Sequence, residues 1–171
     1  NVTHRADPAN TDASAVYIHA STDAISRVQV TNARQIFGLT PVRVQGGGLI
    51  SDPTISSIQI NGISSDAAQY GYMVSGFCYD VIAKNIEVTN PATGMGAVVD
   101  QNASGWQIDG MHVLISDVGI VTDVVAQLRG EGMWDNISCR NPARSMYVDV
   151  LATDFDNITC GKVSGPTYIR G

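Results

Sequence analysis

The chain has 171 residues, enough for one domain with a sizeable core, and a formal net charge of −6. This acidic balance, with no basic cluster, argues against a nucleic-acid partner. No apolar run approaches the roughly 20 residues that cross a bilayer, so no membrane span is expected.

Residue types favour strands and turns over helices. The chain has 17 Gly and 14 Asp but only 2 Glu and 2 Lys, and it is rich in Val, Ile, Ser and Thr. Long-chain helix formers are scarce and β-branched residues abundant, which predicts an all-β protein. Residues 1–14 show little pattern and are expected to form an irregular lead-in. The missing initial Met and the strand-like final segment indicate a piece of a longer chain.

From residue 15 onward, one kind of strand recurs along the chain. Its third residue is almost always β-branched and is expected to point inward, while its fourth residue is polar and is expected to point outward. The segments are "VYIH" (16–19), "VRVQ" (42–45), "YMVS" (72–75), "AVVD" (97–100), "IVTD" (120–123), "MYVD" (146–149) and "TYIR" (167–170).

A second strand repeats in step with the first as an apolar residue, a polar residue and another apolar residue. The first members of successive pairs are separated by 30, 28, 25, 26 and 21 residues. Such a period, with two or three short strands in each repeat, predicts a solenoid whose coils stack through parallel sheets. The pairs are Val28/Val30, Ile58/Ile60, Ile86/Val88, Met111/Val113, Ile137/Cys139 and Ile158/Cys160.

This repeat resembles the right-handed parallel β-helix of the pectin-lyase-like superfamily, over roughly residues 15–171 and about six coils. The likeness rests on the repeat pattern and not on an invariant motif. It implies a protein similar to phage tailspikes and secreted polysaccharide depolymerases, and therefore an extracellular or virion-associated location.

The stretch "WDNISCRN" (134–141) returns 21 residues later as "FDNITCGK". If like residues stack, Ile137 and Ile158 fill one core column, and Cys139 and Cys160 are neighbours with buried, free thiols. Asn85, Asn136 and Asn157 each precede an Ile, where a tight turn favours a residue that tolerates positive φ.

Three outward carboxylates provide the candidate chemistry. Stacking of the fourth residues would place Asp100, Asp123 and Asp149 on successive coils, about 5 Å apart for neighbours and about 10 Å for the outer two. Neighbours would then suit a retaining glycosidase, and the outer two would lie near the upper limit for an inverting one. Alternatively, a Ca²⁺ ion could lie among the oxygens, or the carboxylates could be solvated turn residues.

Arg170 lies one coil beyond Asp149. Resemblance to Ca²⁺-dependent polysaccharide lyases of this fold implies an Arg as base, a part that Arg170 could take. It could equally form a surface ion pair with Asp149, worth at most about 1 kcal/mol.

One strand position before the residues that align with these carboxylates, a further outward row of mainly apolar residues runs along the coils. An exposed apolar row of this length is expected to be covered by a ligand or by another part of a protein. A sugar stacked on Tyr147 and Tyr168, a loop of the chain, or neighbouring subunits of a homotrimer could cover it. The row consists of Tyr17, Arg43, Met73, Val98, Val121, Tyr147 and Tyr168.

The sequence therefore predicts a β-helix that binds, and as a hypothesis cleaves, a polysaccharide or cell-surface glycan. As an enzyme it would be a glycoside hydrolase or a polysaccharide lyase, with Asp100, Asp123 and Asp149 as acid, base or nucleophile, and with Tyr147, Tyr168 and Arg170 on the substrate. No zinc-type cluster or obligatory cofactor is expected. The alternative is a non-catalytic shaft or receptor-binding segment of a trimeric fibre or adhesin.

Overall fold

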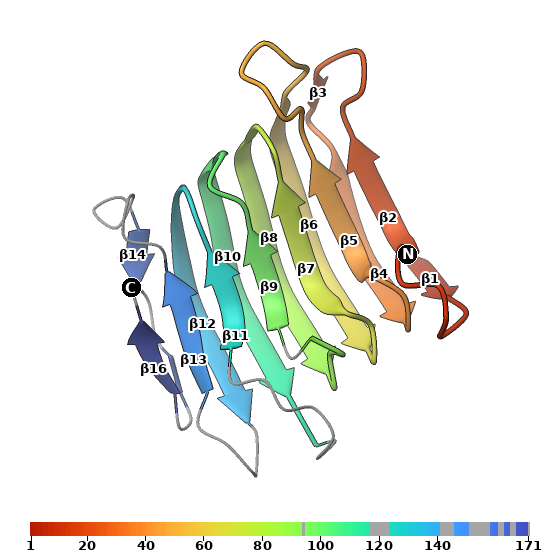
Figure 1. Ribbon diagram of the computed structural model, residues 1–171, viewed down its shortest axis with the longest axis vertical. Helices are drawn as coiled ribbons and strands as arrows, with labels where there is room; N and C mark the ends of the chain where they lie inside the picture. Colours follow the sequence, from red (N-terminus) through yellow and green to blue (C-terminus); the bar gives the residue numbers. More distant parts are fainter. Residues whose placement is uncertain are drawn as a thin grey trace.

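The computed structural model describes residues 1–93, 95–116, 124–140, 146–150, 158–160, 163–164 and 167–170. These residues form a parallel β-solenoid of about four turns, fewer than the six expected. Within them every regular element is a strand. Figure 1 shows the coils stacked side by side, with the two chain ends at opposite ends of the stack.

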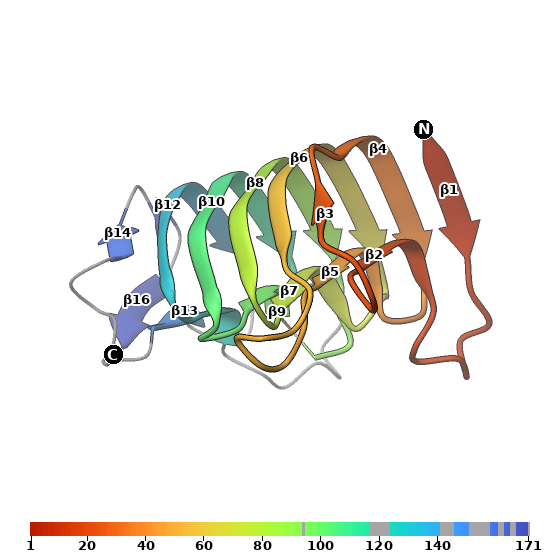
Figure 2. The same ribbon diagram turned by 90° about the horizontal axis from the view of Figure 1, so that it is seen from above.

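Two parallel sheets make up the solenoid. Sheet A has the strand order β1-β4-β6-β8-β10-β12-β14, with β3 and β15 as side members, and sheet B has the order β16-β13-β11-β9-β7-β5-β2. Figure 2 shows the long curved strands of sheet A arching over sheet B. The strands of sheet A are β1 (Val2–Arg5), β3 (Ile25–Ser26), β4 (Gln29–Ile36), β6 (Ile55–Asp66), β8 (Cys78–Thr89), β10 (Ala103–Leu114), β12 (Glu131–Arg140), β14 (Ile158–Cys160) and β15 (Val163–Ser164).

Sheet B is built from the first kind of strand predicted from the sequence. The β-branched residues Ile18, Val44, Val74 and Val99 are all buried, which confirms their inward direction. Residues 120–123 lie outside the described residues; the strand of that coil is described from Val124. The strands are β2 (Ser14–His19), β5 (Thr40–Gln45), β7 (Tyr70–Ser75), β9 (Met95–Val99), β11 (Val124–Leu128), β13 (Met146–Val150) and β16 (Thr167–Arg170).

The expected lead-in contains a strand. Residues 2–5 form β1, which pairs in parallel with β4, with Val2 opposite Ala33 and Arg5 opposite Ile36. The His4 ring nitrogen Nδ1 lies 3.0 Å from Oε1 of Gln35, a side chain that is fully buried. Gln35 also donates through Nε2 to the carbonyl of Phe37 at 2.7 Å, so its amide links the lead-in to the first full coil.

Positive-φ residues bend each long strand of sheet A at fixed places. Within one coil they are five residues apart, and on neighbouring coils they lie side by side. A left-handed backbone costs a non-glycine residue about 1–2 kcal/mol, and Asn and Gly tolerate it best. The three corner columns are Arg27, Ser57, Asp80 and Gly105; then Asn32, Gly62, Asn85, Gly110 and Asn136; then Phe37, Ala67 and Asn90.

The second corner column confirms the prediction for Asn85 and Asn136, whose φ values are 55° and 51°. Both side chains also bond across coils. The Asn85 amide donates to Asn61 Oδ1 at 2.8 Å, and the Asn136 amide donates to Asp109 Oδ1 at 2.9 Å. These bonds link successive coils at the corners and offset part of the backbone strain.

The stacking register differs from the predicted one between the second and third coils. Ile63 lies opposite Ile86, while Ile58 and Ile60 lie opposite Val81 and Ala83. The repeat at this step is therefore 23 residues and not 28. The physical reason is the second corner column, because only this register places Gly62 beside Asn85. The apolar pair equivalent to Ile58 and Ile60 is Val81 and Ala83, and the small Ala83 made this pair hard to identify in the sequence.

A second register correction applies at the C-terminal end. Cys160 lies opposite Trp134, and Val163 lies opposite Ile137. Ile137 and Ile158 are therefore not stacked, and Cys139 and Cys160 are not neighbours. Cys78 and Cys139 are both buried.

Inward side chains of both sheets form one continuous core. Both tryptophans belong to it: Trp106 is 2% exposed and Trp134 is fully buried. The indole N–H of Trp106 donates to the carbonyl of Arg129 at 2.9 Å, which ties β10 to the turn before β12. Side chains fill this core in the part of the chain that the structure describes, so there a ligand can contact the solenoid only on its outer faces, at its ends or on its loops.

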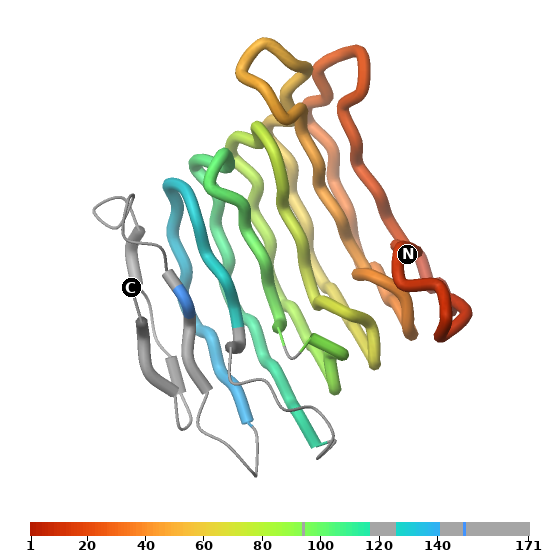
Figure 3. The backbone as a smooth tube through the Cα atoms, in the orientation of Figure 1, coloured from red at the N-terminus to blue at the C-terminus, as the bar shows by residue number. Residues whose placement is uncertain are grey.

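Two loops project beyond the strands at one end of the sheets, as the trace in Figure 3 shows. Residues 20–24 and 46–54 belong to neighbouring coils, and together they line a hollow that contains His19, Gly47 and Asp52. The Asp52 carboxylate accepts the N–H of Leu49 at 2.9 Å and so closes the turn of the second loop. This turn leaves Ile50 82% exposed.

Candidate functional site

Asp100 lies on the outer surface of sheet B, as predicted, but its neighbours differ from the expected ones. Val98 pairs with Gln127, which places Asp100, two residues further along, beside Arg129 on the next coil. Asp123 lies outside the described residues. The sequence pattern predicted a second carboxylate beside Asp100, but the structure places Arg129 there. The sequence pattern did not indicate this arginine.

Asp149 pairs with Gln127 and not with the position beside Asp100. It is therefore two coils away from Asp100 and two residues out of step. From a strand spacing of ~4.8 Å and a rise of ~3.3 Å per residue, their Cα atoms are roughly 12 Å apart. The two residues therefore do not stack in one row, as the predicted register required.

Arg129 holds the Asp149 carboxylate. Its Nη2 lies 3.3 Å from Asp149 Oδ2, and its Nη1 donates to the Asp149 carbonyl at 3.1 Å. The two side chains are 18% and 16% exposed, so this ion pair is largely withdrawn from water. Asp100, by contrast, forms a local turn in which Oδ1 accepts the N–H of Asn102 at 3.4 Å. Of the predicted acidic row, Asp100 therefore has Arg129 beside it, and Asp149 lies in the neighbouring row that contains Val98 and Gln127.

A hollow of about 250 Å³ lies beside Asp100 on sheet B. Its polar wall combines a carboxylate, an amide and a guanidinium, so it can both accept and donate hydrogen bonds. Its apolar wall comes from Met73 and Val98. The polar side chains of the hollow are those of Ser75, Asp100, Gln101, Gln127 and Arg129.

Cys78 lies under this part of sheet B and is fully buried. Burial raises the pKa of its thiol to about 11, and the negative charge of Asp100 adds to the shift. Its Sγ donates to the carbonyl of Ser75 at 3.3 Å. Burial also raises the pKa of Tyr72 well above its usual value. Both groups are therefore neutral core members at physiological pH.

The predicted substrate-binding residues lie at the C-terminal end of sheet B. Tyr147 pairs with Tyr168, and Asp149 pairs with Arg170, so the predicted neighbour relation of Asp149 and Arg170 is confirmed at the backbone. The side chains of Tyr147, Tyr168 and Arg170 lie outside the described part of the structure, and their roles stay predictions.

The outward row before Asp100 is more polar than expected. Register places Gln127 and Asp149 in the row of Met73 and Val98, where Val121 and Tyr147 were expected. The difference arises because the strand of this coil includes Val124–Leu128, whereas "IVTD" was the predicted strand. Both segments alternate between inward and outward residues, so only the packing of the coils decides which of them pairs with β9. The homotrimer inferred from an apolar row stays a prediction, with a shorter apolar stretch to support it.

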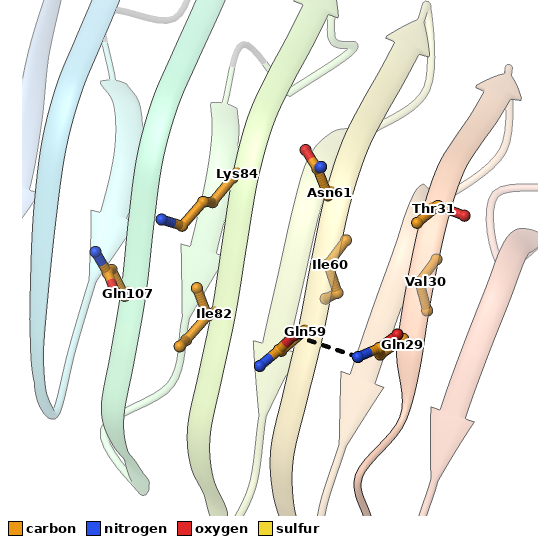
Figure 4. A pocket seen from close by; sticks show the side chains of 9 residues that line it. All are labelled: Gln29, Val30, Thr31, Gln59, Ile60, Asn61, Ile82, Lys84 and Gln107. Atoms are coloured by element: carbon orange, nitrogen blue, oxygen red, sulfur yellow. Dashed lines mark hydrogen bonds between the residues drawn. The ribbon is translucent and has the colours of Figure 1, made fainter.

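A groove with a largely polar lining lies on the outer face of sheet A, between the first and second corner columns. It has a volume of about 420 Å³. One row along its length pairs Gln29 with Gln59, Gln59 with Ile82, and Ile82 with Gln107 across four coils. Figure 4 shows these side chains with the hydrogen bond from Gln29 Nε2 to Gln59 Oε1, at 3.5 Å. We call this set of four residues the glutamine row.

A second row borders the same groove and continues beyond it. It runs from Thr31 through Asn61 and Lys84 to Asp109 and then Asp135, one residue per coil. Lys84 Nζ lies 3.7 Å from Asp109 Oδ2. The row is therefore neutral at its N-terminal end, cationic at one coil and acidic at the next two.

The sequence contained a signal for this groove. Gln29, Gln59 and Glu87 are the polar residues between the first three apolar pairs, so the predicted register places Glu87 after Gln59 in that row. With the corner columns aligned, Ile82 and Gln107 follow Gln59. Gly62, Asn85 and Gly110 stand directly before "IS", "IE" and "MH". Alignment of these three residues was the signal that could have fixed the register.

A neighbouring hollow of about 460 Å³ lies across the second corner column on the same face. It carries one cation, Arg34, and one anion, Glu87, among hydroxyl and amide groups. Its other polar side chains are Asn1, Thr3, Asn32, Ser64 and Asn85. The outer face of sheet A thus offers hydrogen-bonding groups over two adjacent depressions.

No three His, Cys, Asp or Glu side chains gather into a group that could hold a metal ion, within the residues that the structure describes. In the same residues, no helix is long and apolar enough to cross a membrane. Comparison with protein-family models, with curated proteins and with solved structures finds no match. The fold and its surface define the class: a parallel β-solenoid with a polar groove along its outer face.

Proposed function

We propose that this β-solenoid binds a glycan chain that lies along the sheet A groove. The observation that carries the proposal is the glutamine row, in which amide side chains of three coils and one apolar side chain follow each other at the coil spacing. Each amide both donates and accepts hydrogen bonds, which suits the hydroxyl groups of a sugar. Ile82 offers an apolar contact for the C–H face of a sugar ring.

The direction of the groove also supports a linear ligand. Successive coils are about 4.8 Å apart, which is comparable to the length of one sugar residue in an extended chain. A polymer lying parallel to the solenoid axis could therefore repeat the same contact at Gln29, Gln59 and Gln107. A compact small molecule would use only one of these steps.

Two matched substitutions test where the glycan binds. Gln59→Ala removes an exposed amide in the middle of the glutamine row, and Gln127→Ala removes a half-buried amide from the outer face of sheet B. A net hydrogen bond is worth about 0.5–1.5 kcal/mol, so Gln59→Ala should weaken binding about 2- to 12-fold. Gln127→Ala should leave it unchanged.

Binding is measured on a glycan array and then by calorimetry for the best ligand, with circular dichroism to verify that both variants fold. If Gln127→Ala weakens binding and Gln59→Ala does not, the glycan lies on sheet B. No binding by the folded wild-type chain to any glycan would refute the proposal.

A second proposal competes with this one: the glycan lies on sheet B and is cleaved there, which the position of Asp100 in the hollow on sheet B favours. That hollow has a volume suited to one sugar ring and offers Arg129 and Gln127 beside the carboxylate. Asp100→Asn keeps the size of the side chain and removes its charge. Release of reducing ends that persists in Asp100→Asn would exclude this carboxylate as the acid, base or nucleophile.

A further inference from the structure

We propose that the sheet A groove selects an uncharged glycan and rejects acidic polysaccharides. This inference rests on the proposed glycan-binding function and adds the class of ligand. Its basis is the charge pattern along the two rows of the groove, read together with the coil spacing. The occupant is a linear, neutral, hydroxyl-rich or acetamido-bearing chain that runs parallel to the solenoid axis.

The lining of the groove is almost neutral. Among the described residues that line it, four are amides, one is a threonine, and Lys84 alone is charged. That ammonium group is already shared with Asp109 at 3.7 Å. A uronate carboxylate would therefore compete with a carboxylate of the protein for the cation of the groove.

The second row makes a longer acidic ligand unfavourable. A chain that follows the coils past Lys84 reaches Asp109 on the next coil and Asp135 on the one after. Successive uronates would then face successive aspartates at about the coil spacing of ~4.8 Å, an arrangement of like charges that destabilises a pairing. The net charge of −6 on the whole chain acts in the same direction.

A positively charged ligand is also disfavoured along the glutamine row. Lys84 repels an amino sugar at the middle of the groove, and the glutamine row before it contains no carboxylate that could attract one. Gln59 and Gln107 instead provide both donors and acceptors, which a hydroxyl or acetamido group can satisfy at each step. The match of amide groups to neutral sugars therefore extends along the length of the groove.

The experiment compares hexasaccharides of equal length by calorimetry. Neutral hexamers of glucose, mannose, galactose and N-acetylglucosamine are set against hexagalacturonate and hexaglucosamine. A neutral hexamer should bind best, with an affinity that changes less than about 2-fold between low and high salt because no ion pair is formed. Gln59→Ala should weaken it.

Two further outcomes would overturn the inference while keeping the proposed function. One is tighter binding of hexagalacturonate that disappears with salt or in Lys84→Gln. The other is tighter binding of hexaglucosamine that disappears in Asp135→Asn. If the folded protein binds none of the hexamers, the inference and the proposed function both fail.

Discussion

Replacement of Gly130 by alanine tests how closely the turn from sheet B to sheet A packs on the preceding coil. Gly130 lies in the turn between β11 and β12, with a φ of +69°. An added Cβ would lie far inside van der Waals contact of the Ala103 carbonyl oxygen and 3.0 Å from the Gln101 carbonyl oxygen. Both neighbours are backbone atoms of the preceding coil, so neither can rotate away.

The expected loss combines two terms. A left-handed conformation costs alanine about 1–2 kcal/mol. Forcing an extra carbon into a packed site costs typically about 1–3 kcal/mol more. Gly130→Ala should therefore lower the free energy of unfolding by about 2–5 kcal/mol, a large part of the stability of an ordinary domain.

Gly110→Ala is the matched control. Its φ is +72°, but the nearest atom to an added Cβ is Asn85 Oδ1 at 3.5 Å, an ordinary contact. Only the backbone term applies, so the loss should be about 1–2 kcal/mol. Urea unfolding followed by the fluorescence of the buried Trp106 and Trp134 measures both variants by linear extrapolation. Equal losses in the two variants would mean that the turn at Gly130 does not pack on the coil before it, and the reasoning would be refuted.

Three other results are expected. The free energy of unfolding should fall by about 2–3 kcal/mol between pH 9 and 11. The pKa of the Cys78 thiol is near 9.0 in the unfolded chain and near 11 in the folded one, so the unfolded state loses its proton first. Tyr72 adds to the fall above pH 10, and a pH profile of Cys78→Ala as steep as that of the wild type would contradict the assignment. Ile86→Ala should lower the free energy of unfolding in urea by about 2–5 kcal/mol and Ile86→Val by about 0.5–1.5 kcal/mol, because the Ile86 side chain is fully buried. Losses of similar size in the two variants would place Ile86 outside the core. Arg129→Met should cost about 1–3 kcal/mol because Asp149 loses its ion pair with Arg129, and it should cost much less in an Asp149→Asn background. Additive losses in this cycle would show that the two side chains do not interact.

The strand pattern of this protein could be predicted from the sequence because it is local. Alternation of apolar and polar residues identified β2, β5, β7 and β9 and gave the correct inward residues. The recurrence of the pattern predicted a parallel solenoid, since one coil alone cannot bury its apolar face. Asp100 was correctly placed on the outer surface by the same argument.

Register and the functional surfaces were decided by tertiary structure. "IVTD" and "VVAQL" alternate equally well, so the sequence did not reveal that Arg129 stands beside Asp100 or that Asp149 is out of step. Likewise, Gln59 belongs to the row of Gln107 only because the positive-φ corners at Gly62 and Asn85 align. A groove on a solenoid is made of residues that are 23–30 positions apart in the chain. Which of them meet depends on how the coils pack and where the backbone can bend, and these conditions act across coils and not within a strand.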